Sequence, residues 1–518
     1  MEYVVTAHEM KKYDRNTSAH FGISSLVLME RAAIAFVEEI QRRYRNKKRI
    51  LIVAGVGNNG GDGIAIGRIL AQRGYLVTLV FPGDGKRGSD ETKIQLEIYR
   101  KYGQKITDKM PKREYDIIID AVFGIGLNRK VEGIYREVIT DINQRAGIKI
   151  AVDIPSGLDA DNGRILGVCV KADITVTFAF KKRGMILYPG AEYCGKIICK
   201  DIGITRASFL DEEPLMYSYQ ADDIKRLPKR NKAGNKGSFG KVLLLAGSVN
   251  MSGACVLAGL SAYRSGTGLV RIVTTGQNRE IIQKMLPEAI LITYDDSDMT
   301  IKQEIIEGMK WADCIVIGPG LGKSEMAYHL LQMVLEQTKT PLVIDADALN
   351  LIADHEILQK KVCENTRLGA MIIMTPHMGE FSRLTKIPIE ALKDHRIEHI
   401  LRYRQRYGVT LVCKDARTIC CGICDGDERE RLYMNQSGND GMATAGSGDV
   451  LAGIIGSMVA QKLKAFEAAC LGVYIHGLAG DLASKSSNRY SMIASDMIEQ
   501  LKYILSDEKK ADNNYETL

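Results

Sequence analysis

Apolar residues in the first part of the chain follow two different periodicities. Over residues 24–45 they recur every three or four positions, which predicts an amphipathic helix with Ser24 as its N-cap. Short runs rich in valine and isoleucine follow and predict buried strands: 49–55, 75–81, 115–124 and 149–157. Helical stretches between them end at Gly74, Gly103 and Gly147. Continuous apolar strands separated by helices are typical of a parallel sheet covered on both faces, so we predict a doubly wound α/β domain.

A second strand and helix series begins near residue 240 and predicts another doubly wound α/β domain. Its strand-like runs are 241–248, 268–275, 313–322, 340–349, 370–380 and 409–415. Two short runs, 418–424 and 431–435, then predict an antiparallel edge, and three helical stretches close the chain from about 449 to 505. A polar segment separates the two series, so we predict domains at 1–217 and 218–507 and a disordered tail at 508–518.

The composition narrows the class of protein without identifying it. The chain has 518 residues, of which 45% are apolar and 26% charged, as in an average globular protein. No apolar run approaches the roughly 18 residues of a membrane helix, and no secretory signal is visible. The net charge of +7 is a weak bias that fits an anionic small ligand, and no nucleic-acid-binding signature accompanies it. The 11 cysteines lack a framework spacing, so we expect free thiols in the cytoplasm, with buried thiols rather than zinc at Cys413, Cys420, Cys421 and Cys424.

The segment AGVGNNGGDG (54–63) follows the first strand of the series and opens a helix. Its glycines satisfy G-x-G-x-x-G, a spacing that favours a phosphate group at a helix N-terminus. The second strand ends in Val80 and Phe81 and lacks the acidic residue that holds a ribose in dinucleotide-dependent oxidoreductases. A dehydrogenase is therefore disfavoured.

Polar residues also follow two further strands of the same sheet. Asp120 ends one strand, Asp153 and Ser156 end the next, and a second glycine-rich loop follows Asp120 at 124–130. Any one of these polar residues could simply cap the next helix. Because ligands bind outside the carboxyl ends of the strands in an open α/β sheet, we expect Asn59, Asp120, Asp153 and Ser156 to converge on a site.

The motifs NNGGDG (58–63) and VDIPSG (152–157) resemble those of the NAD(P)H-hydrate epimerase domain, and the resemblance covers about residues 1–215 with a Rossmann-like fold. It implies a potassium ion held by Asn59, Asp120 and Ser156, whose oxygen atoms suit a hard cation. Inversion at C6 of the hydrated cofactor opens a hemiaminal-like centre, so Asp153 is the candidate acid and base. The implied substrate contacts are Asn58, Asn59, Gly60, Gly61, Asp62, Gly124, Ile125, Gly126, Leu127, Asn128, Arg129, Lys130 and Asp153.

The segment NQSGNDGMATAGSGDVLAG (435–453) carries the second candidate site. It places Gly446, Gly448 and Asp449 at the start of an apolar helix, where the backbone can close on a phosphate and the helix N-terminus stabilises negative charge. Asp449 can accept a proton from an attacking hydroxyl, as the aspartate does in phosphoryl transfer. The alternative, a helix N-terminal charge, fits less well with the many small residues around it.

This element resembles the anion hole of the ribokinase-like superfamily. The motifs KGSFGKVLLLAGS (236–248), DADALN (345–350) and TPHMGE (375–380) narrow the resemblance to the ADP- or ATP-dependent NAD(P)H-hydrate dehydratase domain, over about residues 220–507. The resemblance implies a Mg²⁺ ion that offsets the charge of an ADP or ATP co-substrate. Carried over by motif, Ala254, Gly322, His377 and Asp449 contact the hydrate, and Lys414, Asp415, Ala416, Arg417, Thr418 and Gly448 contact the nucleotide.

Three positions depart from the family pattern. Asp415 stands where the family usually has glycine, Asp440 where it has proline, and Asn235 where a histidine often stands. Asp415 adds negative charge to a nucleotide loop, and the choice between ADP and ATP stays open, although the fused arrangement favours ADP by analogy.

The two resemblances together lead us to expect a bifunctional enzyme that repairs hydrated NADH and NADPH. Two alternatives remain: a small-molecule kinase with a non-catalytic Rossmann-like domain, and a binding module that senses a ligand or partner. We further expect a homo-oligomer that binds neither nucleic acid nor membranes.

Overall fold

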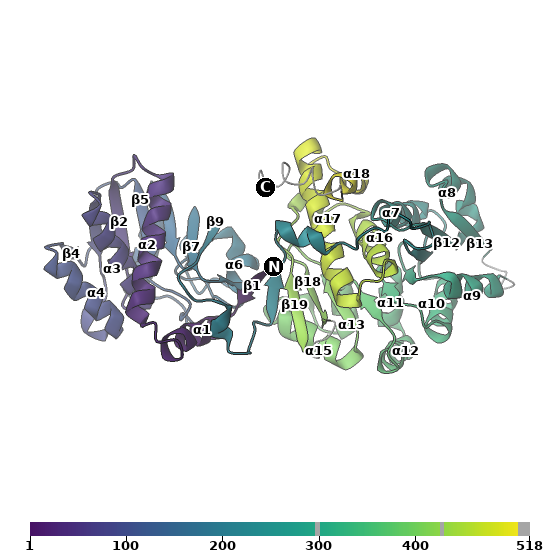
Figure 1. Cartoon of the computed structure of the whole chain (residues 1–518), viewed down its shortest axis with the longest axis horizontal. Coiled ribbons are helices and arrows are strands. Elements are labelled where there is room, and N and C mark those ends of the chain that lie inside the picture. Colours follow the sequence, from purple (N-terminus) through teal and green to yellow (C-terminus); the bar gives the residue numbers. More distant parts are fainter. Residues whose placement is uncertain (296–300, 425–428, 506–518) are drawn as a thin grey trace. The chain divides into compact units, whose positions relative to one another are not determined.

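The computed structural model describes residues 1–295, 301–424 and 429–505. The chain divides into two compact units, one of residues 2–216 and one of residues 217–518 with Met1. The predicted disordered tail at 508–518 lies outside the described residues. Both units have the α/β architecture that the sequence predicts (Figure 1).

The N-terminal unit contains a seven-stranded parallel sheet with the strand order β4-β3-β2-β5-β6-β7-β9. Its strands are β2 (Arg49–Ala54), β3 (Leu76–Val80), β4 (Ile106–Thr107), β5 (Ile117–Ala121), β6 (Ile148–Val152), β7 (Ile174–Phe178) and β9 (Lys196–Lys200). Outside this sheet, β1 (Glu2–Val5) and β8 (Lys181–Lys182) pair in parallel. The helices are α1 (Ala7–Ala19), α2 (Ser25–Arg43), α3 (Asn58–Gln72), α4 (Asp90–Lys101), α5 (Gly133–Gln144) and α6 (Arg183–Ile186).

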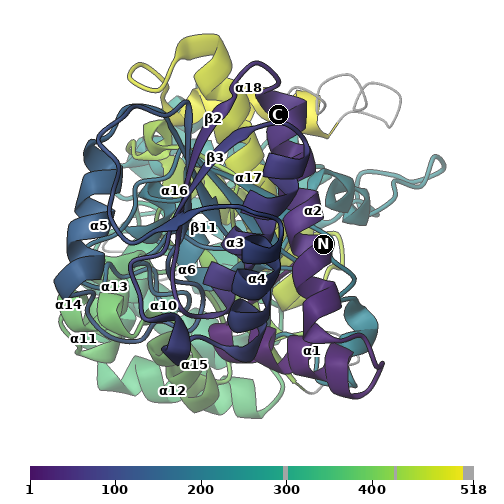
Figure 2. The ribbon, with the colours of Figure 1, turned by 90° about the vertical axis from the view of Figure 1, so that its left-hand side faces the viewer.

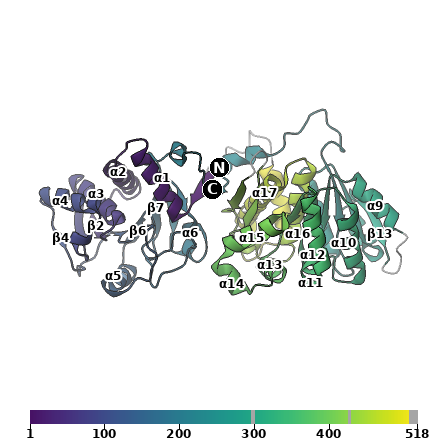
Figure 3. The same cartoon turned by 90° about the horizontal axis from the view of Figure 1, so that it is seen from below.

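Alternate residues of the central strand β2 face opposite layers of helices, which explains its continuous apolar run. Leu51 and Val53 pack in one cluster with Ile139 of α5. Ile52 faces α3, where a Cβ on Gly67 would lie 3.1 Å from Ile52 Cδ1. Accordingly, Figures 2 and 3 show α5 on one side of the sheet and α2, α3 and α4 on the other. The predicted N-cap of the second helix is confirmed, because Ser24 Oγ accepts from the Val27 N–H at 3.4 Å.

The C-terminal unit contains a larger sheet, parallel from β13 to β17, with the order β13-β12-β11-β14-β15-β16-β17-β18-β19-β10. The predicted antiparallel edge is confirmed as β18 and β19, although β10 lies beyond β19. The strand runs predicted from the sequence do not include β13. The strands are β10 (Met216–Ser218), β11 (Lys241–Leu245), β12 (Leu269–Thr275), β13 (Ile290–Tyr294), β14 (Cys314–Ile317), β15 (Leu342–Ile344), β16 (Ile372–Met374), β17 (Thr410–Cys413), β18 (Ile419–Ile423) and β19 (Glu430–Met434).

Helices cover both faces of this sheet, and α16 packs closely on its centre. A Cβ on Gly456 of α16 would lie 2.5 Å from Val316 Cγ2 of β14, so only a residue without a side chain allows this approach. The helices are α7 (Ser252–Arg264), α8 (Arg279–Met285), α9 (Lys302–Trp311), α10 (Glu325–Gln337), α11 (Ala346–Asp354), α12 (Glu356–Arg367), α13 (Met378–Thr385), α14 (Ile389–Asp394), α15 (Arg396–Tyr407), α16 (Ser447–Ala460), α17 (Ala465–Ser487) and α18 (Ala494–Ile504).

None of the helices in the described part of the chain is both long enough and apolar enough to cross a membrane. The described side chains also contain no group of three or more His, Cys, Asp or Glu residues that could hold a metal ion. Cys413, Cys420 and Cys421 are buried free thiols in β17 and β18, as predicted, whereas the predicted burial is wrong for Cys424, a half-buried thiol just after the end of β18.

Candidate functional sites

The N-terminal unit has a cavity of about 610 Å³ at the carboxyl ends of its central strands. Most of the residues predicted from the two glycine-rich loops line it: Asn58, Asn59, Asp62, Gly124, Ile125, Gly126, Leu127, Asn128 and Arg129. Asp153 lines it as well, so the loops and the end of β6 meet as expected. Gly60, Gly61, Lys130, Asp120 and Ser156 are not among the lining residues.

Gly60 and Gly61 have a packing role at the start of α3. A Cβ on Gly60 would lie 1.7 Å from the carbonyl oxygen of Gly55, and one on Gly61 would lie 2.7 Å from Met29 Cε. These two glycines let the turn after β2 close tightly, which directs Asn58, Asn59 and the N-terminus of α3 toward the cavity.

Asp153 has an unusual backbone conformation and a crowded carboxylate. Its φ of 64° lies in the left-handed region, which non-glycine residues adopt at a cost, although Asp and Asn do so more readily than most. Its Oδ1 accepts hydrogen bonds from Thr177 Oγ1 at 3.1 Å, from the Phe178 N–H at 3.2 Å and from the ammonium group of Lys182. The chain thus holds the carboxylate in one orientation at the cavity wall.

Asp120, Ser156 and Asn59 form a buried polar cluster behind the cavity. Asp120 Oδ1 accepts from Ser156 Oγ at 2.5 Å, and its Oδ2 accepts from the Ser156 N–H at 2.7 Å. The carbonyl oxygen of Phe123 accepts from Asn59 Nδ2 at 3.1 Å and from Ser156 Oγ at 3.3 Å, which links the three predicted potassium ligands. Burial raises the pKa of Asp120 to about 6.

The donor set of this cluster fits a hard cation. Asn59 Oδ1 is buried and has no hydrogen-bond partner in the described part of the chain, which is costly unless another group contacts it. A buried carboxylate, a hydroxyl, an amide oxygen and a backbone carbonyl are the oxygen ligands that a hard cation prefers.

The structure adds charged residues that the motifs did not reveal. Lys182 from β8, together with Lys11 and Asp14 from α1, lines the same cavity. Lys11 Nζ lies 3.7 Å from where a Cβ on Gly126 would stand, which places a cation beside the second glycine-rich loop. Burial, followed by the charges of Asp153 and Asp14, raises the pKa of Asp62 well above its usual range. Lys182, Lys11 and Asp14 belong to elements without motif spacing, so only the fold brings them to the site, whereas Asp62 is part of the NNGGDG motif.

In the C-terminal unit, the predicted phosphate-binding element is the N-terminus of α16. Gly446 caps the helix with a φ of 87°, a conformation that favours glycine. A Cβ on Gly448 would lie 3.4 Å from Lys414 Nζ and 3.8 Å from Asp345 Oδ2. Lys414 Nζ donates to Asp345 Oδ1 at 2.7 Å, while Asp345 Oδ2 is buried and has no partner among the described residues. A lysine thus lies directly at the dipole-positive end of the helix.

Two carboxylic acids near this helix end have strongly raised pKa values. Burial, followed by the charge of Asp345, raises the pKa of Asp449 to about 7, and the positive charge of Lys414 opposes the shift. Burial is also the main cause that raises the pKa of Glu380 to about 7. An Asp that titrates near neutral pH at a helix N-terminus is suited to take a proton during the reaction.

Gly322 follows β14 and His377 follows β16, and β15 lies between these two strands. His377 caps α13, because its Nδ1 accepts from the Gly379 N–H at 3.0 Å. Its backbone also forms an isolated parallel β-bridge with Lys414. Burial lowers the pKa of His377, and Lys414 adds to this effect, so the neutral imidazole is favoured. The Gly322 N–H donates to Asp347 Oδ2 at 2.8 Å, and a Cβ on the nearby Gly320 would lie 2.8 Å from Ala254 Cβ.

The negative charge of Asp415 in the loop 414–418 is compensated by Arg396, the first residue of α15. Arg396 Nη1 binds Asp415 Oδ2 at 2.9 Å, and Arg396 Nη2 donates to the Cys413 carbonyl oxygen at 2.9 Å. Asp415 Oδ1 accepts from the Ala416 N–H at 2.9 Å, and Thr418 Oγ1 donates to the Asp415 carbonyl oxygen at 3.2 Å. The added negative charge is therefore paired within the unit.

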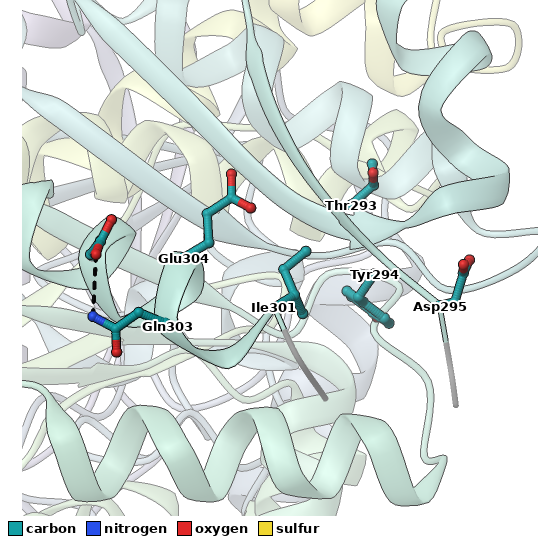
Figure 4. Close-up of a pocket in the computed structure, with 7 residues that line it drawn as sticks. Thr293, Tyr294, Asp295, Ile301, Gln303 and Glu304 are labelled. Atoms are coloured by element: carbon teal, nitrogen blue, oxygen red, sulfur yellow. Dashed lines mark hydrogen bonds between the residues drawn. The ribbon is translucent and has the colours of Figure 1, made fainter. Parts of the chain in front are cut away.

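A separate hollow lies elsewhere in the C-terminal unit, between β13 and α9 (Figure 4). It has a volume of about 460 Å³ and includes the acidic residues Asp295, Glu304 and Glu307. None of the predicted site residues lines it.

Comparison with known proteins supports both halves of the sequence interpretation. A family model described as NAD(P)H-hydrate dehydratase matches residues 242–503. A second model, described as YjeF-related protein N-terminus, matches residues 25–184. The two matches fall in separate units, and each contains one of the sites described above.

Curated relatives match over almost the whole chain. The bifunctional NAD(P)H-hydrate repair enzyme Nnr of Moorella thermoacetica is 36% identical, over 97% of this chain and 96% of the relative. The enzyme of the same name from Coxiella burnetii is 34% identical, over 94% and 96%. The solved structure of the ADP/ATP-dependent NAD(P)H-hydrate dehydratase from Bacillus subtilis, co-crystallized with ATP and Mg²⁺, is 27% identical over 55% of this chain and 96% of that chain, with a TM-score of 0.44. On the full-length matches, the chain belongs to the family of bifunctional NAD(P)H-hydrate repair enzymes.

Proposed function

We propose that this chain repairs hydrated NADH and NADPH with two active sites. The N-terminal unit interconverts the R and S epimers at C6, and the C-terminal unit dehydrates the S epimer at the expense of ADP or ATP. The observation that carries the proposal is the group at the N-terminus of α16, where Asp449 has a pKa of about 7 and the Lys414–Asp345 pair lies beside Gly448.

In the dehydratase site, Asp449 takes the proton of the C6 hydroxyl as that oxygen attacks the terminal phosphorus of the nucleotide. The N–H groups at the start of α16 and the ammonium of Lys414 stabilise the charge on the transferred phosphoryl group. The phosphate then leaves C6 with its bonding electrons, pushed by the ring nitrogen. Loss of a proton from C5 restores the double bond of NAD(P)H.

The remaining predicted residues of this unit have supporting roles in the proposal. Ala254, Gly322 and His377 bind the hydrate, and the loop 414–418 binds the nucleotide together with Gly448. Because Arg396 pairs with Asp415, the loop offers the nucleotide no unpaired negative charge from that residue. Mg²⁺, when bound with the nucleotide, would offset the charge of its phosphates.

In the epimerase site, Asp153 is the proposed acid and base. Inversion at C6 breaks either the bond to the ring nitrogen, after the hydroxyl loses a proton, or the bond to the hydroxyl oxygen, after it gains one. Asp153 and Asp62 both line the cavity and are the proposed base and acid for either route, since burial raises the pKa of Asp62 and so favours its acid form. Residues 58–62 and 124–130, with Lys11, bind the phosphates of the substrate.

Asn59, Asp120 and Ser156 would hold the potassium ion of this unit. The ion would supply a fixed positive charge behind the cavity, which would stabilise negative charge that develops on the substrate. Replacing potassium by choline in the buffer is expected to lower the epimerisation rate at least about 10-fold and to leave the dehydration of pure S hydrate unchanged. Asn59→Leu removes the unpaired oxygen and should abolish the response to potassium. Epimerisation that is equally fast in both buffers would contradict the ion's role.

The whole proposal is tested by one coupled assay. Purified protein is mixed with R and S hydrated NADH, Mg²⁺ and either ADP or ATP, and absorbance is followed at the reduced-nicotinamide band. Complete recovery of NADH supports both activities, while recovery of only the S fraction removes the epimerase. No recovery with either nucleotide contradicts the proposal, and a stable phosphorylated product would favour the alternative, a small-molecule kinase.

Three further points stand as proposals with their own measurements. We place the enzyme in the cytoplasm, which cell fractionation tests. We expect a homo-oligomer, which light scattering of the purified chain tests. Neither nucleic acid nor lipid vesicles should bind the chain in a sedimentation assay.

A further inference from the structure

Lys182 is the most deeply buried charged residue at the epimerase cavity. Its side chain is 1% exposed, and it reaches the cavity wall from β8, where Lys182 pairs with Val5 of β1. A buried ammonium is costly unless its hydrogens are all bonded and an opposite charge is close. No sequence motif of the two glycine-rich loops or of the strand ends includes it.

All three hydrogens of the Lys182 ammonium have protein acceptors. The group donates to Asp153 Oδ1, to Thr177 Oγ1 at 2.8 Å and to the Phe178 carbonyl oxygen at 3.2 Å. It therefore has no donor left for a substrate, and its effect must pass through Asp153.

The same contacts make the two oxygens of Asp153 unequal. Oδ1 accepts from three donors, namely Thr177 Oγ1, the Phe178 N–H and Lys182 Nζ. Within the part of the chain that the structure describes, no hydrogen bond reaches Oδ2, and the Asp153 side chain keeps 14% exposure at the cavity. Oδ2 is thus the atom that can exchange a proton with a bound molecule.

We propose that Lys182 is the positioning residue of the epimerase, which binds Oδ1 of Asp153 so that Oδ2 faces the C6 hydroxyl of the hydrate as an ionised base. This inference rests on the proposed function of the N-terminal unit. Lys182 fixes the carboxylate both by geometry and by charge, because an ammonium in contact with a carboxylate favours its ionised form.

The other groups that face Asp153 make this cation necessary. Asp14 of α1 and Asp62 of α3 bring two more carboxyl groups to it, and both have raised pKa values. From β9, Cys199 contributes a thiol whose pKa burial raises to about 11, so it is neutral. Among these neighbours Lys182 alone is positive, so its ammonium is the group that offsets the negative charge gathered around Asp153.

The test compares Lys182→Met with Lys181→Met as the matched control. Lys181 is the neighbouring residue of β8 and binds Glu2 at 3.0 Å, outside the cavity lining. The conversion of R to S hydrate is followed by chromatography over a range of pH. For Lys182→Met we expect kcat about 100-fold lower, KM within about threefold of the wild type, and the acidic limb of the pH profile at higher pH. Lys181→Met should match the wild type.

Several outcomes separate this inference from the proposed function. A wild-type chain that never converts R to S hydrate removes the proposed function itself. A Lys182→Met variant with wild-type kcat and pH profile overturns only the role of Lys182. Lys182→Met could unfold the N-terminal unit, which circular dichroism would show while dehydration of S hydrate by the C-terminal unit stays intact. In that case Thr177→Val is tested in place of Lys182→Met. That change removes one partner shared by Lys182 and Asp153, so kcat should fall about 10-fold at constant KM, and an unchanged rate overturns the inference.

Discussion

Asp449→Asn is expected to lower the dehydration rate of pure S hydrate about 10³-fold. The amide cannot accept the hydroxyl proton, and general base catalysis contributes about 10²–10⁴-fold to such reactions. The substitution is nearly isosteric, so the start of α16 and the binding of both substrates should persist, with KM values within a few-fold of the wild type. The measurement is the rate of NADH formation from S hydrate with ADP or ATP in excess.

The pH profile of the dehydratase gives an independent check on the same residue. Because the base must be ionised and the pKa of Asp449 is about 7, the wild-type rate should rise with pH through 7. At pH 6 only about one tenth of the carboxyl groups are ionised, so the rate should be about one tenth of its alkaline plateau. This limb should be absent from the residual activity of Asp449→Asn.

Asp440→Asn is the matched control for that experiment. Asp440 precedes the same helix, but it lies on the surface and pairs with the exposed Arg489 at 3.3 Å. Its substitution should leave the rate and the pH profile unchanged. An Asp449→Asn enzyme that retains more than about a tenth of the wild-type rate would show that another group takes the proton.

The sequence predicted the sheet class and the loops because each depends on local patterns. Valine and isoleucine runs marked the central strands, and the glycines of NNGGDG and AGSGD marked the turns where the helix N-termini meet them. The predicted strands differ from the observed strands at their ends. The predicted strand 115–124, for example, ends at Ala121 in β5, where the polypeptide turns toward the second glycine-rich loop. The edge strand β13 carries a similar run, ILITY, so the local signal was present and the prediction missed it; only its exposed and half-buried positions mark it as an edge.

The charged partners of the candidate site residues could not be predicted in the same way. Lys182 meets Asp153 from 29 positions away, and Asp345 meets Lys414 from 69 positions away. Such pairs follow from sheet order and register, which bring distant strand ends to one edge. The same holds for the raised pKa of Asp449, since burial and the nearby Asp345 cause it and neither is visible in the motif.

Asp153→Asn is expected to lower the conversion of R to S hydrate about 10³-fold, because the amide nitrogen or oxygen in place of Oδ2 cannot exchange the proton. Asn is the suitable replacement, since it tolerates the φ of 64° and can still accept from Thr177 and Phe178 through Oδ1. Dehydration of pure S hydrate should be unaffected, so the coupled assay should stop once the S fraction is consumed.

Asp173→Asn is the control, because Asp173 lies at the opposite end of β7 and binds the Lys149 N–H at 2.8 Å. If Asp153→Asn still consumed the R fraction at the wild-type rate, the proton would have to pass through another group, and Asp62 would be the next residue to replace.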